Sequence, residues 1–118
     1  MDFRVGEINI VCTALDRSLR FYRDVVGCRL VEEEAGAVRL ELGGRHLLLL
    51  PFAKTAAMAD AYCSRAEITF DLLVENLAEA AGHFGAHGVE FEKAWEEGAA
   101  SFVVRDPDGL RIEVVARA

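Results

Sequence analysis

The sequence predicts a single α+β domain made of two similar β-α-β-β-β halves. Short segments alternate like strands, two segments have the apolar spacing of helices, and the same order returns about sixty residues later. A repeat of this length is typical of an internally duplicated supersecondary unit. With 118 residues, 53% of them hydrophobic, the chain is long enough and apolar enough for one packed core.

The first half is expected to begin with a strand and a helix. Residues Glu7–Cys12 alternate between apolar and mixed side chains, as a half-buried strand does. Over Leu15–Val26 the apolar residues recur at the spacing of one helical face, and Gly27 supplies a helix stop. Three strands should follow, the last two joined by a Gly43-Gly44 hairpin turn: Cys28–Glu33, Val38–Leu42 and His46–Leu50.

The second half repeats this order after a linker. Residues 52–64 are rich in alanine without a steady period, and they separate a module over about residues 5–51 from one over about 65–117. The second module should have a strand over Glu67–Val74 and a helix that starts near Leu77 and stops at Gly88. The Asp-Pro-Asp-Gly sequence of Asp106–Gly109 predicts a turn. The remaining strands are expected over Val89–Trp95, Ser101–Arg105 and Arg111–Ala116.

Composition and charge restrict the partners and the location. The formal net charge of −7 disfavours nonspecific binding to nucleic acid or to an anionic membrane, since both need basic patches. The longest apolar run, Leu47–Leu50, is too short to cross a bilayer, and the first residues lack the pattern of a signal peptide. The three cysteines form no metal-binding spacing, and their odd number argues against a disulfide framework. We therefore expect a cytoplasmic protein.

Two segments resemble motifs of the glyoxalase/bleomycin-resistance/dioxygenase family, the vicinal-oxygen-chelate superfamily. Residues 15–27, LDRSLRFYRDVVG, are similar to its D-L-x-x-S-x-x-F-Y-x-x-x-L-G motif, with Ala14 where the first Asp usually stands. Residues 102–113, FVVRDPDGLRIE, are similar to its D-P-D-G-x-x-I-E ending. The resemblance covers nearly the whole chain. It implies that each module curls into an open half-barrel, that paired modules enclose a concave cleft, and that a homodimer completes the cleft.

The resemblance also implies a metal site. In the family's metal enzymes the ligands come from the first strand of each half and from the last strand of the second half. Matching by motif puts Glu7, Glu67 and Glu113 at these positions. Glu113 is the usual residue there, whereas the other two positions usually hold His or Gln. The fourth ligand position of some members falls on Leu48, which cannot bind a metal.

Strand alternation independently places the three glutamates on polar faces, and their chemistry restricts the cation. Carboxylates without imidazole or thiolate favour Mn²⁺, Mg²⁺, Ca²⁺ or Fe²⁺ over Zn²⁺. No organic cofactor is indicated. Without a metal, converging carboxylates repel, and at least one should take up a proton near neutral pH. The cluster could then hold a cationic substrate, or a protonated Glu could act as an acid.

Two functional hypotheses follow. The first is a divalent-metal enzyme, an isomerase, lyase or related proton-transfer catalyst on a small oxygenated molecule, with Glu113 or Glu67 carrying the proton. The second is a metal-free protein that binds and sequesters a toxic or antibiotic molecule. Either would take a small-molecule ligand, and an acidic cleft fits a cationic one best. The candidate substrate-binding residues are Asn9, Thr69, Ser101 and Arg105 on the polar strand faces, and Trp95 as a lid or stacking residue.

Overall fold

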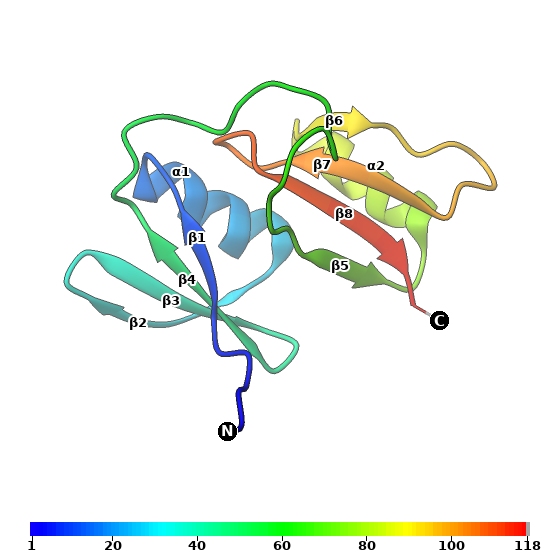
Figure 1. The fold of residues 1–118 in the computed structure, drawn as a ribbon. Helices are drawn as coiled ribbons and strands as arrows, with labels where there is room; N and C mark the ends of the chain where they lie inside the picture. The colour runs from blue at the N-terminus through cyan, green and yellow to red at the C-terminus, as the bar shows by residue number, and fades with distance from the viewer. Residues whose placement is uncertain (118) are drawn as a thin grey trace. The chain divides into compact units, whose positions relative to one another are not determined.

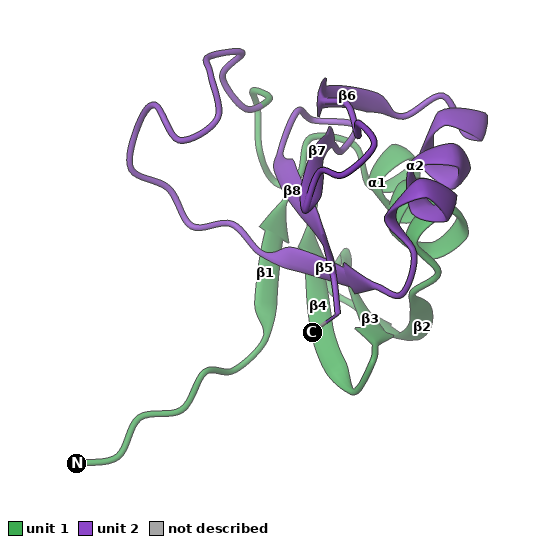
Figure 2. Cartoon of the chain, turned by 90° about the vertical axis from the view of Figure 1, so that its right-hand side faces the viewer, with its two compact units in different colours: residues 1–56 green, residues 57–118 purple. Residues whose placement is uncertain are grey.

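The computed structural model describes residues 1–117 and divides into two compact units. The first unit is Met1–Ala56 and the second begins at Ala57 (Figure 2). Each unit has one four-stranded mixed sheet with its helix packed on one face (Figure 1). This arrangement confirms the predicted pair of β-α-β-β-β modules. No helix among residues 1–117 is long and apolar enough to span a membrane.

The first unit has the strand order β1-β4-β3-β2. Its first strand pairs in parallel with its last, and the other pairs are antiparallel. The predicted strands are confirmed within a residue or so at each end, and the Gly43-Gly44 turn joins β3 to β4 with both glycines at positive φ. The elements are β1 (Ile8–Val11), α1 (Leu15–Leu19), η1 (Arg20–Val26), β2 (Arg29–Glu34), β3 (Ala37–Leu42) and β4 (Arg45–Leu50).

The predicted helix over Leu15–Val26 changes its winding halfway. It is α-helical in α1 and π-helical in η1, and Gly27 ends it with a φ of 96°. The N–H of Cys28 then donates to the carbonyl of Tyr22 at 2.9 Å. Apolar spacing over so few turns does not distinguish the two hydrogen-bonding patterns, so the sequence predicted only that a helix was present.

The second unit has the corresponding order β5-β8-β7-β6. The prediction of a strand over Glu67–Val74 is wrong in its first four residues, because β5 begins at Asp71. The ladder between β5 and β8 starts where Asp71 meets Glu113, and alternation alone does not show where a backbone partner is lacking. The elements are β5 (Asp71–Val74), α2 (Leu77–Ala86), β6 (Glu90–Lys93), β7 (Ser101–Arg105) and β8 (Arg111–Ala116).

Each sheet has a core face and an opposite face, which we call the helix-free face. Alternate strand residues are buried on the core face, where α1 packs against β4 and α2 against β8. In the second unit, Phe84 of α2 meets Phe102 of β7 edge to face, with 6.1 Å between ring centroids. The buried residues on the core faces are Ile10, Cys12, Val38, Leu40, Leu47 and Leu49 in the first unit and Phe102, Val104, Ile112 and Val114 in the second.

The three cysteines should differ sharply in reactivity. Cys12 and Cys28 are buried, and burial raises the pKa of Cys28 to about 11, whereas Cys63 is exposed. Since the thiolate is the reactive form, we expect one thiol per chain to react with Ellman's reagent in the native protein. Cys63→Ser should remove this reaction, and denaturation of the parent should release all three thiols. Rapid native labelling of the Cys63→Ser protein would contradict the buried placement of the other two.

Candidate functional site

The strand registers align one residue from each strand of the first unit in a transverse row. Asn9 of β1 lies beside Leu48 of β4, which lies beside Arg39 of β3, which in turn lies beside Glu32 of β2. We call these four residues the first row. Asn9 and Glu32 are exposed, and Leu48 and Arg39 are half-buried. Because the register fixes which side chains are neighbours, it brings polar residues from distant parts of the sequence onto one face.

The second unit has a corresponding row with different chemistry. Asp71 of β5 lies beside Glu113 of β8, followed by Val103 of β7 and Lys93 of β6. We call these residues the second row. By this correspondence Glu113 occupies the place that Leu48 occupies in the first unit. The two modules therefore share a backbone design but present a carboxylate in one and an aliphatic side chain in the other.

Glu7 precedes β1 and is held by an arginine of its own unit. The guanidinium of Arg39 donates from Nε and Nη2 to the two carboxylate oxygens of Glu7, at 2.8 and 3.1 Å. These hydrogen bonds lower the pKa of Glu7. Arg39 also donates to Glu32. The lone pairs of Glu7 that a metal would need are therefore directed at a guanidinium.

A small pocket opens on the helix-free face of the first unit. Its volume is about 180 Å³. Acidic side chains of β2, the guanidinium of Arg39 and the apolar side chain of Leu48 contribute to its wall. The pocket therefore combines charged and aliphatic surface. Its lining residues are Glu32, Glu34, Ala35, Ala37, Arg39 and Leu48.

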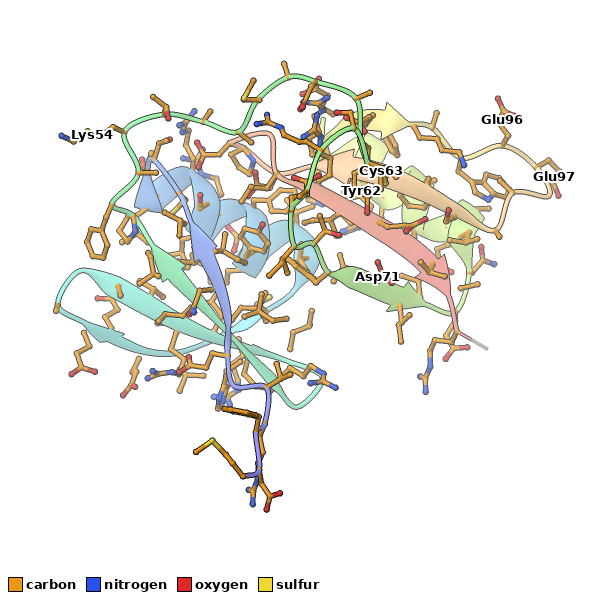
Figure 3. All side chains as sticks on the ribbon, viewed as in Figure 1. Lys54, Tyr62, Cys63, Asp71, Glu96 and Glu97 are labelled. Carbon is orange, nitrogen blue, oxygen red and sulfur yellow. The ribbon has the colours of Figure 1, made fainter. Side chains whose placement is uncertain are left out.

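Glu113 has a carboxylate neighbour that the sequence analysis did not single out. Asp71 stands directly opposite Glu113 on the adjacent parallel strand, and Figure 3 labels it at the start of β5. Neighbouring strands are about 4.8 Å apart, so the two residues are direct neighbours on this face of the sheet. Asp71 is exposed and Glu113 is half-buried. Only the register identifies this pair, because the two residues are far apart in the sequence.

The strand registers relate Glu7 to a residue other than Glu67 in the second unit. Asn9 and Asp71 are counterparts in their rows, so the residue two places before each gives Glu7 and Thr69 as counterparts. The Thr69 hydroxyl lies 3.2 Å from the Tyr62 hydroxyl. Glu67 is exposed and lies outside β5.

The other predicted binding residues lie on β7 and after β6. Ser101 is half-buried opposite Val115, and Arg105 donates to Glu92 at 2.5 Å. The same Glu92 oxygen accepts from Arg111 at 3.0 Å. Glu92 and Arg111 were not among the predicted site residues, and only the tertiary contacts connect them to Arg105.

Trp95 lies beyond the end of β6, which stops at Lys93 and not at Trp95 as predicted. Its indole N–H donates to the carbonyl of Ala99 at 3.2 Å. Trp95 is half-buried, and this hydrogen bond spans the loop between β6 and β7. This contact ties Trp95 to its own loop.

The residues present do not fit the predicted three-glutamate cation site. Glu7 is already bound by Arg39, and Glu67 is outside the sheet. Among residues 1–117, no group of three or more His, Cys, Asp or Glu side chains is placed to hold a metal ion. Asp71 and Glu113 supply two adjacent carboxylates, so water or other groups would have to complete the coordination of Mn²⁺, Mg²⁺ or Ca²⁺.

Residues 4–114 match the model of the family described as the Glyoxalase/Bleomycin resistance protein/Dioxygenase superfamily. The chain belongs to this superfamily. The match spans both units and includes the two motifs that resembled it. Among curated proteins, none matches the chain.

Solved structures of this superfamily share the fold. Lactoylglutathione lyase from Agrobacterium tumefaciens is 26% identical with a TM-score of 0.69, over 96% of this chain and 92% of that one. The trypanothione-dependent glyoxalase I of Leishmania major is 24% identical with a TM-score of 0.77, over 98% and 87%. Fosfomycin resistance protein FosX from Listeria monocytogenes is 15% identical with a TM-score of 0.74, over 100% and 94%. The last two likenesses concern the fold alone.

Arg39→Met should make stability depend less on pH in the acidic range. The lowered pKa of Glu7 means that its ion pair stabilises the native state above the unfolded pKa of about 4.5 and is lost as the pH falls through the lower folded value. We expect Arg39→Met to lower the melting temperature at pH 7, and the difference from the parent to shrink below pH 4.5.

A double-mutant cycle with Glu7→Gln separates the ion pair from the packing of the Arg39 stem. We expect Glu7→Gln to cost much less stability in the Arg39→Met background than in the parent. Additive effects of the two substitutions, or a pH-independent difference, would contradict the pairing.

Proposed function

We propose that this protein binds a small organic cation on the helix-free face of its first unit, without a resident divalent metal. The observation that carries this proposal is the pocket between β2, β3 and β4, which joins an acidic rim to an apolar floor. Membership of the superfamily is compatible with both an enzyme and a resistance protein. The choice between them therefore depends on the chemistry of this chain's own faces.

The charge of the pocket favours a cation. Among its lining residues, Glu32 and Glu34 supply two carboxylates against the guanidinium of Arg39, which leaves a formal charge of −1. Arg39 is engaged by Glu7 and Glu32, so it offers little attraction to an anionic ligand. The net charge of −7 on the whole chain adds long-range attraction for cations.

The floor and size of the pocket restrict the ligand further. Leu48 replaces a metal-binding side chain with an aliphatic surface, and Ala35 and Ala37 add to it. Ligand pockets for drug-sized molecules are typically about 300–1,000 Å³, whereas this one is about 180 Å³. It therefore suits an ammonium or guanidinium group on a short carbon chain, either as a whole ligand or as one arm of a larger molecule.

A divalent-metal enzyme is the second candidate, and the pair of Asp71 and Glu113 favours it. Two adjacent carboxylates are the hard donors that Mn²⁺ or Mg²⁺ takes, and a bound cation would relieve their repulsion. The remaining ligands would have to come from water, substrate or a second copy of the chain in the expected homodimer. When bound, such an ion would polarise a substrate oxygen, as in the predicted isomerase or lyase chemistry. Glu113 and Asp71 would then be the residues that hold it.

Glu32→Gln should weaken the binding of small amines and guanidines. One surface charge pair contributes on the order of 1 kcal/mol, so we expect affinity for agmatine or a similar probe to fall about five- to tenfold in calorimetric titrations. Glu33→Gln is the matched control, because Glu33 pairs with Val38 and so faces the other side of β2. Equal losses in the two variants would show only a general charge effect. No detectable binding of any amine by the parent would refute the proposal.

The response to Mn²⁺ separates the two candidates. The proposed binding protein should show no change in melting temperature. A metal-bound site should stabilise by about 2.7 kcal/mol at one hundred times Kd, a rise on the order of 10 °C. Glu113→Gln should abolish such a rise while Glu90→Gln, on the far strand of the same sheet, keeps it. That pattern, fading as the pH falls into the carboxylate range, would establish a metal-binding site that depends on Glu113 and would refute the metal-free proposal.

A further inference from the structure

Residues 57–66 form a segment across the helix-free face of the second sheet, which we call the strap. The N–H of Ala57 donates to the carbonyl of Asp108 at 2.9 Å, in the turn between β7 and β8. The N–H of Tyr62 donates to Glu92 on β6, also at 2.9 Å. Figure 3 labels Tyr62 and its neighbour Cys63 on this segment. The strap therefore lies against the side of the sheet that does not carry α2.

Two arginines on this face share one carboxylate. Arg105 and Arg111 stand opposite each other on β7 and β8, and both donate to the same oxygen of Glu92. The side chain of Arg111 is only 3% exposed and that of Arg105 is 14% exposed. Two guanidiniums side by side would repel, so each needs an anion, and Glu92 alone supplies one charge for two.

The second anion is Asp60 of the strap. Arg111 donates to both the carbonyl and the carboxylate of Asp60, the latter at 3.1 Å. The other carboxylate oxygen of Asp60 accepts from Arg65 at 2.7 Å and from the Ser64 hydroxyl at 3.1 Å. The hydrogen bonds from Arg65 and Ser64 lower the pKa of Asp60 to about 2, so it stays charged at neutral pH.

The Asp60 carboxylate is bound as a ligand oxyanion would be, by two guanidiniums and a hydroxyl, although it belongs to the chain itself. The cluster holds three arginines and two carboxylates, a formal charge of +1 within a chain of −7. Without the Asp60 carboxylate, the formal charge of this cluster would be +2. Such a cluster suits the carboxylate or phosphate group of a ligand.

The strap can leave this position at a modest cost. It belongs to no strand or helix, and most of its residues are exposed. Cys63 has a φ of 67°, a left-handed conformation that is unfavourable for a residue other than glycine and would relax if the strap moved. The contacts that the Asp60 carboxylate accepts, from Arg111, Arg65 and Ser64, are ones that a ligand oxyanion can accept in its place.

We propose that Arg105 and Arg111 form an anion-binding site in the second unit, and that Asp60 fills it as an internal stand-in which an incoming oxyanion displaces. This site goes beyond the proposed cation binding, since it lies in the other unit and selects the opposite charge. While Asp60 occupies the site, a ligand can bind only to those chains in which Asp60 has moved away. The apparent Kd for the ligand is therefore the intrinsic Kd divided by the fraction of such chains. Removing the charge of Asp60 should therefore expose the full affinity of the arginines.

The test uses inorganic phosphate as the probe, at constant ionic strength, on the full chain. We expect Asp60→Asn to bind phosphate about tenfold more tightly than the parent by calorimetric titration, and Asp60→Asn combined with Arg111→Met to lose that gain. Glu75→Gln is the matched control, because it removes a carboxylate from the exposed Arg117 pair in the same unit. If Asp60→Asn does not fold, Asp60→Ser carries the same expectation.

Two results would overturn the proposal. The first is an affinity of the Asp60 variant for phosphate no higher than that of Glu75→Gln, which would show that only the overall charge matters. The second is an unchanged affinity after Arg111→Met is added to the Asp60 variant, which would place the phosphate elsewhere. Neither result bears on amine binding, which Glu32→Gln tests in the first unit.

Discussion

The parallel pairing of the first and last strand of each unit is the constraint on which the two transverse rows depend. It sets β1 beside β4 and β5 beside β8, and it thereby decides that Asn9 meets Leu48 and that Asp71 meets Glu113. A shift by one residue would move every side chain of a strand to the other face. The buried core residues fix the register, and the chemistry of the helix-free face follows from it.

Duplication has kept the backbone of the module while the two faces have diverged. Both units carry an irregularity in the same outer strand pair, between Leu30 and Glu32 in one and between Phe91 and Lys93 in the other. The first row is nevertheless built around Arg39 and an apolar neighbour, whereas the second has adjacent carboxylates. The fold thus provides positions in a sheet, and the side chains at those positions determine what each face can bind.

Arginines form ion pairs with several of the acidic side chains. Arg39 joins Glu7 to Glu32, and Arg111 joins Glu92 to Asp60, so several carboxylates that look available in the sequence are already paired. Asp71 and Glu113, in contrast, face each other across the ladder between β5 and β8. Because Glu7 is paired in this way, the three glutamates that the motifs indicate do not form a metal site, although the chain belongs to the superfamily.

The sequence by itself determined the two-module order, the helix stop at Gly27, and the bounds of β7 and β8. These features follow from alternation, apolar spacing and glycine, all of which act between near neighbours in the chain. Only the tertiary structure decided where β5 begins, which residue corresponds to Glu7, and which charges are paired. Arg39 and Glu7 are 32 positions apart, and Arg111 and Asp60 are 51 positions apart. No local pattern encodes such contacts, because they form only when strand register and the path of the strap are set together.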